Sequence, residues 1–298
     1  MTKPTTRDGY SPRHALDCER VLVTLLRGLG PWKDAVYLVG GLTPRYLVNP
    51  DPPRVPEHSG TQDVDIVIDL PLLTDTAAYN TLEHNLKRIG FVRAENSDGA
   101  KVSWRWQIQT ENGTLVLVEL LTEAPDIAGG RHQPLPTDGA LSAINIPHAS
   151  IVHDMYRCAE ITAELLGDDG TATERIRHAD RVAFTCLKAF AFDDRKERKD
   201  AHDLVYCIEY APGGLDDVAA DFRRALTGAH TMVVRKAIDV LRNRFADDAA
   251  VDGYRKDGPI AVAKFELGDS AEPAQRDARA LRQRQVSDLI ERLLRKIA

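Results

Sequence analysis

The sequence predicts an α+β fold, in which a mixed β-sheet with flanking helices is followed by a mostly helical lobe. Before about residue 180, short β-forming runs bounded by glycine and proline alternate with amphipathic helical patterns. After Pro212 nearly every segment has helical spacing of its apolar residues. We therefore expect two lobes, residues 1–178 and residues 179–298.

The first lobe begins with a helix whose apolar stripe ends at a Gly-Leu-Gly-Pro stop signal. Asn112-Gly113 predicts a hairpin between two β-forming runs, and Gly167–Gly170 predicts a second hairpin. Two stretches rich in proline and glycine, 49–59 and 125–139, are expected to be loops. The expected elements are helices over 12–29, 42–48 and 76–89, and strands over 35–39, 62–70, 102–109, 114–121, 161–166 and 173–178.

The second lobe is expected to begin with helices over 180–192 and 199–209, with Asp180 as the N-cap of the first. Helices and turns follow to the end, apart from a loop rich in glycine and aspartate over 252–258.

Composition excludes several classes of protein. The chain has 298 residues, of which 43% are hydrophobic and 28% charged, so wholesale disorder is excluded. No apolar run approaches the ~20 residues of a membrane span, and the first residues have no apolar core typical of a signal peptide. We expect a cytoplasmic protein without a membrane partner. The four cysteines have no metal-type spacing: Cys18, Cys158, Cys186 and Cys207.

The net charge of −6 argues against a protein that coats DNA. Its distribution is uneven, because residues 222–298 hold 16 basic and 11 acidic residues while residues 1–221 hold 23 and 34. A basic section on an acidic body suggests a polyanionic partner for the C-terminal part. The alternative is that these arginines and lysines are only the solvated faces of amphipathic helices.

The most informative segment is Asp63-Val64-Asp65-Ile66, in the strand predicted over 62–70. Side chains alternate between the faces of a strand, so the two aspartates share one face, roughly 6–7 Å apart at Cβ. Like charges this close repel, and a divalent cation that bridges them relieves the repulsion. A lone pair of this kind is more often a solvated strand edge.

Glu119 lies in an otherwise apolar strand, where its face companions are leucines. A buried, ionised carboxylate without a partner costs several kcal/mol, so Glu119 should be paired or bind a metal. Placed beside Asp63 and Asp65, it would complete a three-acid site for Mg²⁺, which prefers oxygen ligands.

Gly40-Gly41 leads from one predicted strand into a helix. Glycines at such a turn let backbone N–H groups approach phosphate closely. Alone this is weak evidence. A strand, Gly-Gly, a helix and then a strand with Asp-x-Asp is a more specific pattern.

This order of motifs resembles the nucleotidyltransferase (polymerase-β-like) superfamily, which implies a nucleotidyltransferase-type mixed sheet. The second lobe narrows the resemblance, because Lys188, Arg195 and the run Lys199-Asp200-Ala-His-Asp203-Leu204 look like the AbiEii/AbiGii-type toxin branch, to which the mycobacterial MenT toxins belong. The resemblance covers roughly residues 35–210. One departure is that 22 positions separate Gly41 from Asp63, where the superfamily has about a dozen, and the proline-rich stretch 49–59 accounts for the excess as an insertion.

The resemblance implies a role for each matching residue. Asp63 and Asp65 would hold Mg²⁺, or Mn²⁺ in its place, and Glu119 would hold the metal at the attacking hydroxyl and help deprotonate it. Gly40, Gly41 and Thr61 would contact phosphate oxygens, and Lys188 would contact the β- and γ-phosphates. Asp200 would either orient Lys188 or contact the nucleotide. The second choices for nucleotide contacts are Arg195, Lys199 and Asp203.

The resemblance therefore implies an enzyme that moves a nucleoside monophosphate from an NTP to an acceptor. In the toxin branch the acceptor is the tRNA 3′ end, and a cognate antitoxin protein would be a further partner. The alternatives are a protein or small-molecule acceptor, or an NTP-binding module without turnover. A metal-dependent nuclease fits less well, because Glu119-Leu-Leu lacks the expected acid-x-Lys triplet.

Three alternatives remain for single residues. Lys188 could be an ordinary surface lysine, and Lys199 with Asp203 a plain i, i+4 helical ion pair. Trp104 and Trp106 share a strand face and favour packing over base stacking. The remaining histidines considered show no spacing that indicates a site: His132, His148, His153, His178 and His202.

Overall fold

The computed structural model describes the chain except residues 1–3, 70–75, 96–97, 125, 127, 136–140 and 168. The chain is mixed α/β, with a mixed sheet and a helical C-terminal region. It forms two compact units, each built from separate stretches of sequence. The sheet unit contains Ser11–Thr43 and Gly60–Asp180, and the helical unit contains Met1–Tyr10, Pro44–Ser59 and Arg181–Ala298.

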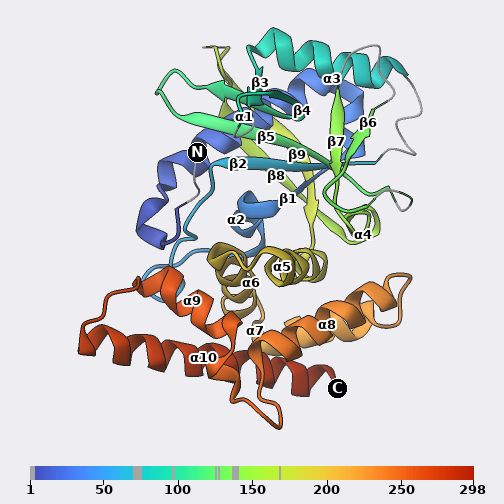
Figure 1. The fold of residues 1–298 in the computed structure, drawn as a ribbon. Coiled ribbons are helices and arrows are strands. Elements are labelled where there is room, and N and C mark those ends of the chain that lie inside the picture. Colours follow the sequence, from blue (N-terminus) through green and yellow to red (C-terminus); the bar gives the residue numbers. More distant parts are fainter. Residues whose placement is uncertain are drawn as a thin grey trace. The chain divides into compact units, whose positions relative to one another are not determined.

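The sheet unit is organised around one mixed sheet (Figure 1). Its main path among the described residues runs β3-β4-β5-β2-β1-β9-β8, and β7 joins β5 and carries β6. The strands are β1 (Val36–Val39), β2 (Asp63–Ile68), β3 (Val92–Glu95), β4 (Lys101–Gln109), β5 (Leu115–Thr122), β6 (His132–Pro134), β7 (Ser142–Asn145), β8 (Tyr156–Glu164) and β9 (Thr171–Ala179).

The register of three central strands positions the predicted acids. β2 is antiparallel to β1 and parallel to β5, and Asp65 lies opposite Val39 on one side and Glu119 on the other. On β2, Val64, Ile66 and Ile68 are almost fully buried, while Asp65 is half-buried. Asp63 and Val67 on the other face are buried as well, so β2 is covered on both faces and Asp65 is its most exposed residue.

The backbone N–H of Thr110 donates to the Thr114 carbonyl, so these two residues are the last pair of the β4–β5 hairpin. The loop between them therefore has three residues, Glu111-Asn112-Gly113. Gly113 has a positive φ of 80°, the usual arrangement in a three-residue hairpin loop. This loop places Arg105 of β4 opposite Glu119 of β5. A two-residue loop would have placed Trp106 there instead.

The helices of the sheet unit provide its core. α1 contacts β2, β5, β8 and β9, so its apolar stripe covers one side of the sheet, and α3 lies beside α1. Ser11 begins α1 as an N-cap, because its hydroxyl accepts from the backbone N–H of Arg13. The helices are α1 (Pro12–Leu29), α3 (Thr76–Ile89) and α4 (Ile151–Asp154), with 3-10 turns over Gly30–Ala35 and Gly40–Leu42.

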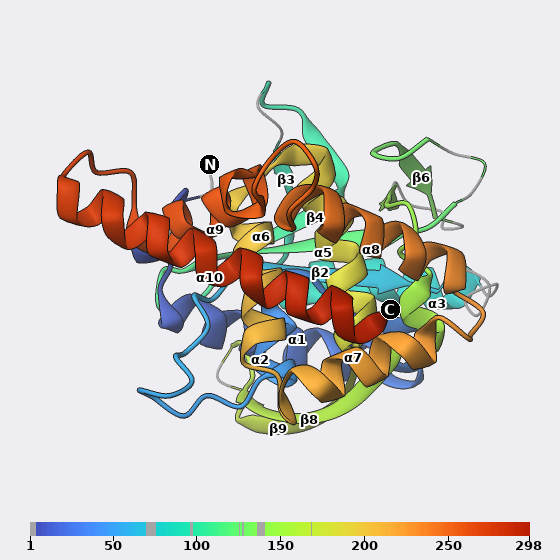
Figure 2. The ribbon, with the colours of Figure 1, turned by 90° about the horizontal axis from the view of Figure 1, so that it is seen from below.

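The helical unit packs around α10, which runs across α7, α8 and α9 (Figure 2). α5 lies against α6 and α8, and α6 lies against α9. The elements are α2 (Pro44–Leu47), α5 (Arg181–Arg195), α6 (Arg198–Glu209), α7 (Gly214–Ala225), α8 (Thr231–Phe245), α9 (Asp257–Leu267) and α10 (Pro273–Ile297), with 3-10 turns over Arg7–Gly9 and Gly253–Arg255.

Several expectations about elements were wrong. The strand expected over 161–166 is β8, Tyr156–Glu164, and the loop expected over 252–258 contains a 3-10 turn over Gly253–Arg255 and the start of α9 at Asp257. Helix 42–48 is shorter, since a 3-10 turn is followed by one helical turn in α2. The stretch expected to be a loop, 125–139, contains the strand β6. Residues 125, 127 and 136–139 of this stretch lie outside the described residues. β3 and β7 were not predicted, because each has only four residues and lacks a long alternating pattern. In the described part of the chain, none of the helices combines the length and apolar character that a bilayer crossing needs.

Candidate functional site

The sheet unit brings together the three predicted acids. Asp65 of β2 lies directly opposite Glu119 of β5, and Asp63 follows two residues away on the same face of β2. Asp63 is 5% exposed, and the Glu119 side chain is 13% exposed. Carboxylates so little exposed are costly unless each has a partner, so the partners of this group decide its chemistry.

Gly40 brings the backbone against Asp65. It follows β1 with a φ of +68°, a conformation that favours glycine. A Cβ at this position would overlap the Asp65 carboxylate, so only glycine lets the turn approach so closely. Gly41 is buried in the same turn, which the N–H of Thr43 closes by donating to the Gly40 carbonyl at 3.2 Å. The glycine pair therefore lies at the acids.

Glu119 forms an ion pair that sequence reasoning missed. Its Oε1 lies 2.6 Å from a guanidinium nitrogen of Arg105, the residue opposite it on β4. Arg105 is 31% exposed, and its Cζ lies 4.4 Å from the centroid of the Trp104 ring. Of the two outcomes expected for Glu119, pairing and metal binding, the structure shows pairing.

The backbone at the start of β2 is fixed by Thr61. The buried Thr61 hydroxyl accepts a hydrogen bond from the backbone N–H of Asp63 at 3.2 Å. The Cys18 thiol of α1 donates to the Thr61 carbonyl at 3.7 Å. Burial first, and then the charges of Asp63, Asp17 and Asp65, raise the pKa of the Cys18 thiol well above its usual value.

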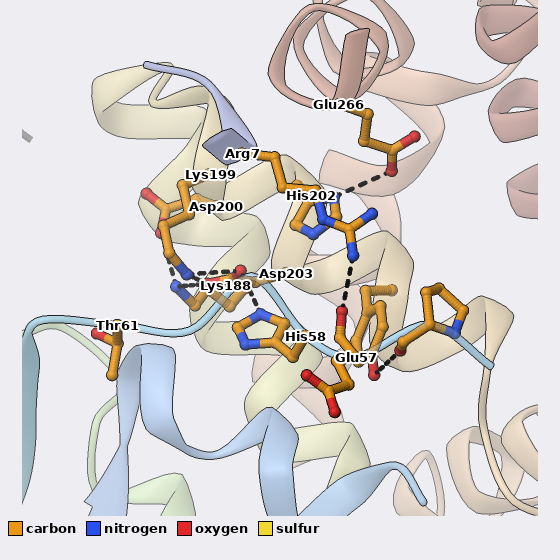
Figure 3. Close-up of polar contacts among 12 residues, drawn as sticks. Arg7, Glu57, His58, Thr61, Lys188, Lys199, Asp200, His202, Asp203 and Glu266 are labelled. Atoms are coloured by element: carbon orange, nitrogen blue, oxygen red, sulfur yellow. Dashed lines mark hydrogen bonds and ion pairs between the residues drawn. The ribbon is translucent and has the colours of Figure 1, made fainter. Parts of the chain in front are cut away.

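The helical unit brings together Lys188 and Asp200, two other predicted residues (Figure 3). Lys188 of α5 donates to Asp200 Oδ1 at 2.9 Å and to Asp203 Oδ2 at 2.8 Å, both on α6. Lys188 is only 7% exposed, so it is not an ordinary surface lysine. Arg195 also donates to Asp200, at 2.6 and 2.9 Å.

Lys199 and Asp203 form the expected i, i+4 pair, but they are buried within a larger network. Lys199 Nζ donates to both oxygens of Asp203 at 2.8 Å, and Asp203 is fully buried. Burial alone would raise the pKa of Asp203, but Lys188 and Lys199 hold it well below its usual value. Burial lowers the pKa of Lys188, but Asp200 and Asp203 outweigh burial and raise it. Asp203 is therefore ionised and Lys188 protonated.

The proline-rich stretch 49–59 contributes His58 to this network. His58 Nε2 lies 2.8 Å from Asp203 Oδ1, and its ring is 5.1 Å from the ring of Tyr206. The Tyr206 hydroxyl donates to the Pro56 carbonyl at 2.8 Å, and Arg7 donates to the Glu57 carbonyl at 2.9 Å (Figure 3). These contacts fix the end of the insertion on α6. His58 was missed because its partner is 145 positions away.

One group of described residues has possible metal-ligand atoms within 4.8 Å of one another: His58, His202 and Asp203. His202 also has a partner that its spacing did not reveal, because its Nδ1 lies 3.0 Å from Glu266 Oε1. Both oxygens of Asp203 already accept from two ammonium groups. A divalent cation here would lie beside those two positive charges, so we interpret the set as a charge-compensated network and not as a metal centre.

The acids of the sheet fit a hard cation better. Asp63, Asp65 and Glu119 supply carboxylate oxygens, the ligands that Mg²⁺ prefers. The turn at Gly40 adds backbone that approaches Asp65 because no Cβ intervenes. To bind a cation, Glu119 would have to exchange its contact with Arg105.

The chain matches no model of a known protein family and has no significant match among curated proteins. The predicted residues thus fall into two groups. Gly40, Gly41, Thr61, Asp63, Asp65 and Glu119 belong to the sheet unit, and Lys188, Arg195 and Asp200 belong to the helical unit.

Proposed function

We propose that this protein is a Mg²⁺-dependent nucleotidyltransferase of the polymerase-β-like type. The observation that carries the proposal is the register of β2 and β5, which aligns Glu119 with Asp65 and leaves Asp63 on the same face. The turn at Gly40, which overlies Asp65, supports it. Along the chain, β1 is followed by the turn at Gly40 and then by the paired acids of β2, which is the order of motifs in the superfamily that the sequence resembles.

The proposed reaction transfers a nucleoside monophosphate. The oxygen of an acceptor hydroxyl forms a bond to the α-phosphorus of an NTP, the bond from that phosphorus to the bridging oxygen breaks, and pyrophosphate leaves. Bound Mg²⁺ would neutralise the charge that develops on the attacking and leaving oxygens.

The residues have distinct roles in this proposal. Asp63 and Asp65 would hold the cation, and Glu119 would hold the metal at the attacking hydroxyl and accept the proton of that hydroxyl. Backbone N–H groups at Gly40 and Gly41 donate to phosphate oxygens. Lys188, kept protonated by its two aspartates, is the cation that the resemblance assigns to the β- and γ-phosphates.

For the acceptor we propose the 3′ end of tRNA, and for the biological role a toxin with a cognate antitoxin. This part rests on the resemblance to the AbiEii/AbiGii-type branch. The surplus of basic residues after residue 221, 16 against 11 acidic, agrees with a polyanionic acceptor.

The test is an incubation of the protein with Mg²⁺, each α-labelled NTP separately, and total tRNA. We expect label in tRNA and release of pyrophosphate, with a loss of at least about 100-fold in Asp65→Asn because a cation ligand is lost. Glu160→Gln, which changes an exposed acid on β8, is the matched control and should behave like the parent.

Other outcomes would revise the proposal. Label in protein bands or in a small molecule would change the acceptor and keep the chemistry. NTP binding without release of pyrophosphate would identify a non-catalytic binding module. Incorporation by Asp65→Asn at the parent rate would refute the assignment of the acids.

A further inference from the structure

The ion pair between Arg105 and Glu119 lies at the proposed cation site. Arg105, Glu119 and Asp65 are consecutive members of one row across β4, β5 and β2. The guanidinium nitrogen is 2.6 Å from Glu119 Oε1, the distance of a close ion pair. One positive charge of the protein therefore already lies among the carboxylates that the proposal assigns to a cation.

This position has an electrostatic consequence for a free metal ion. A dication bound by Glu119 would lie within a few ångströms of the Arg105 guanidinium unless that side chain moved, and like charges at this distance repel. If Arg105 moved away, it would lose its carboxylate partner. Either way, the ion pair opposes binding of the metal alone.

A nucleoside triphosphate changes this balance. It brings three to four negative charges, of which a dication neutralises about two. A planar guanidinium donates to phosphate oxygens in the same forked geometry that it uses with carboxylates. Arg105 is 31% exposed and its guanidinium lies over the face of Trp104, so part of the side chain is open to such a ligand.

We infer that Arg105 is an internal counter-ion of the cation site, which competes with free metal for Glu119 and exchanges Glu119 for phosphate when the metal arrives with a nucleotide. The inference rests on the proposed function and adds a residue that the resemblance does not assign. Its consequence is that the site discriminates against free divalent cations in favour of the metal–nucleotide complex.

Binding of Mn²⁺, followed by the electron paramagnetic resonance signal of the free ion, tests this without turnover. The protein is titrated with Mn²⁺ alone, and with Mn²⁺ plus an α,β-methylene analogue of each NTP. In Arg105→Met we expect binding of Mn²⁺ alone to tighten about fivefold, which corresponds to losing one half-buried ion-pair competitor. In the same variant, the increase in Mn²⁺ affinity that the nucleotide analogue causes should shrink by at least the same factor, because the phosphate no longer has the Arg105 guanidinium as a partner.

Two variants serve as controls. Arg93→Met removes an arginine with similar surroundings, since Arg93 lies 3.5 Å from Glu83 and 5.5 Å from the Trp106 ring. It should leave both affinities unchanged. Arg105→Lys keeps a positive charge and should restore weak binding of Mn²⁺ alone, which separates the effect of charge from that of packing.

The outcomes are distinguishable. If the parent binds Mn²⁺ with nucleotide and Arg105→Met binds Mn²⁺ alone no more tightly than the parent, the role of Arg105 is refuted and the proposed function stands. If the parent binds no Mn²⁺ with or without any of the analogues, the cation site is refuted, and both proposals fall with it.

Discussion

Two aspartates on different elements show how neighbours decide the chemistry of one residue type. Asp203 of α6 accepts from Lys188, Lys199 and His58, so its charge is neutralised within the protein. Asp65 of β2 lies beside a glycine turn and opposite another acid, Glu119. The first arrangement stabilises an ionised network, and for the second we propose an external cation.

The charge network predicts a large loss of stability on removing one buried cation. Lys188→Met leaves Asp200 and Asp203 without a shared ammonium group, and we expect a loss of about 3–5 kcal/mol in the free energy of unfolding. Arg195→Met removes a side chain that is 53% exposed from the same Asp200, and should cost less than about 1 kcal/mol. Urea denaturation of both variants measures the difference, and equal losses would contradict the network.

His58 predicts the pH dependence of stability. Burial lowers the pKa of His58 from 6.5 to about 4, although Asp203 opposes the shift. The unfolded chain therefore binds a proton between pH 6.5 and pH 4 that the folded chain does not, and stability falls as the pH falls through this window. The loss amounts to about 3 kcal/mol.

The check is the unfolding free energy of His58→Gln against pH. Glutamine keeps an N–H donor for Asp203 but does not titrate, so its profile should be flatter than that of the parent between pH 4 and pH 6.5. Above pH 6.5 the two slopes should agree. Parallel profiles across the whole range would mean that folding leaves the pKa of His58 unchanged.

At the level of elements, alternation along a strand could be predicted from the sequence, but register could not. The apolar face of β2 and the shared face of Asp63 and Asp65 follow from a period of two. The pairing of Glu119 with Arg105 depends on the three-residue loop that contains Asn112-Gly113. In a hairpin with a two-residue loop, the register shifts by one and Trp106 lies opposite Glu119 in place of Arg105. The sequence motif is compatible with both loops.

The turn between β1 and α2 predicts a difference between two glycine substitutions. Both Gly40 and Gly113 have a positive φ, but an added Cβ overlaps Asp65 only at Gly40 and meets nothing within 4 Å at Gly113. Gly113→Ala should cost about 1 kcal/mol from backbone strain alone.

Gly40→Ala should cost clearly more than Gly113→Ala and should also weaken binding of Mn²⁺ with nucleotide, because Asp65 is displaced. Thermal unfolding and Mn²⁺ titration of both variants measure this. Equal effects on stability and on metal binding would show that the approach of Gly40 to Asp65 is unimportant.

For the whole molecule, sequence patterns predicted a sheet lobe followed by a helical lobe, divided after residue 178. In the structure two segments from the first lobe, Met1–Tyr10 and Pro44–Ser59, belong to the helical unit. Composition marked 49–59 as an irregular insertion but carried no sign of where it would attach. Its attachment depends on single long-range contacts, such as Tyr206 to Pro56 and His58 to Asp203, which leave no local pattern.

This organisation predicts how fragments behave. Residues 11–180 contain all the strands that the structure describes and should unfold cooperatively by circular dichroism. Residues 181–298 lack His58 and Pro56, the partners of Asp203 and Tyr206 on α6, and should unfold with a broader transition at lower urea concentration. A fragment 181–298 as cooperative as the longer protein would contradict the contribution of the inserted segment.

The central claim is that Asp63, Asp65 and Glu119 hold a divalent cation together with a nucleotide. A crystal structure grown with Mn²⁺ and a non-hydrolysable NTP, with anomalous diffraction recorded at the manganese edge, tests it most directly. The account predicts an anomalous peak about 2.1–2.3 Å from carboxylate oxygens of Asp63 and Asp65, with Glu119 released from Arg105. A peak at His58, His202 and Asp203 instead, or none at the acids with nucleotide bound, would contradict it.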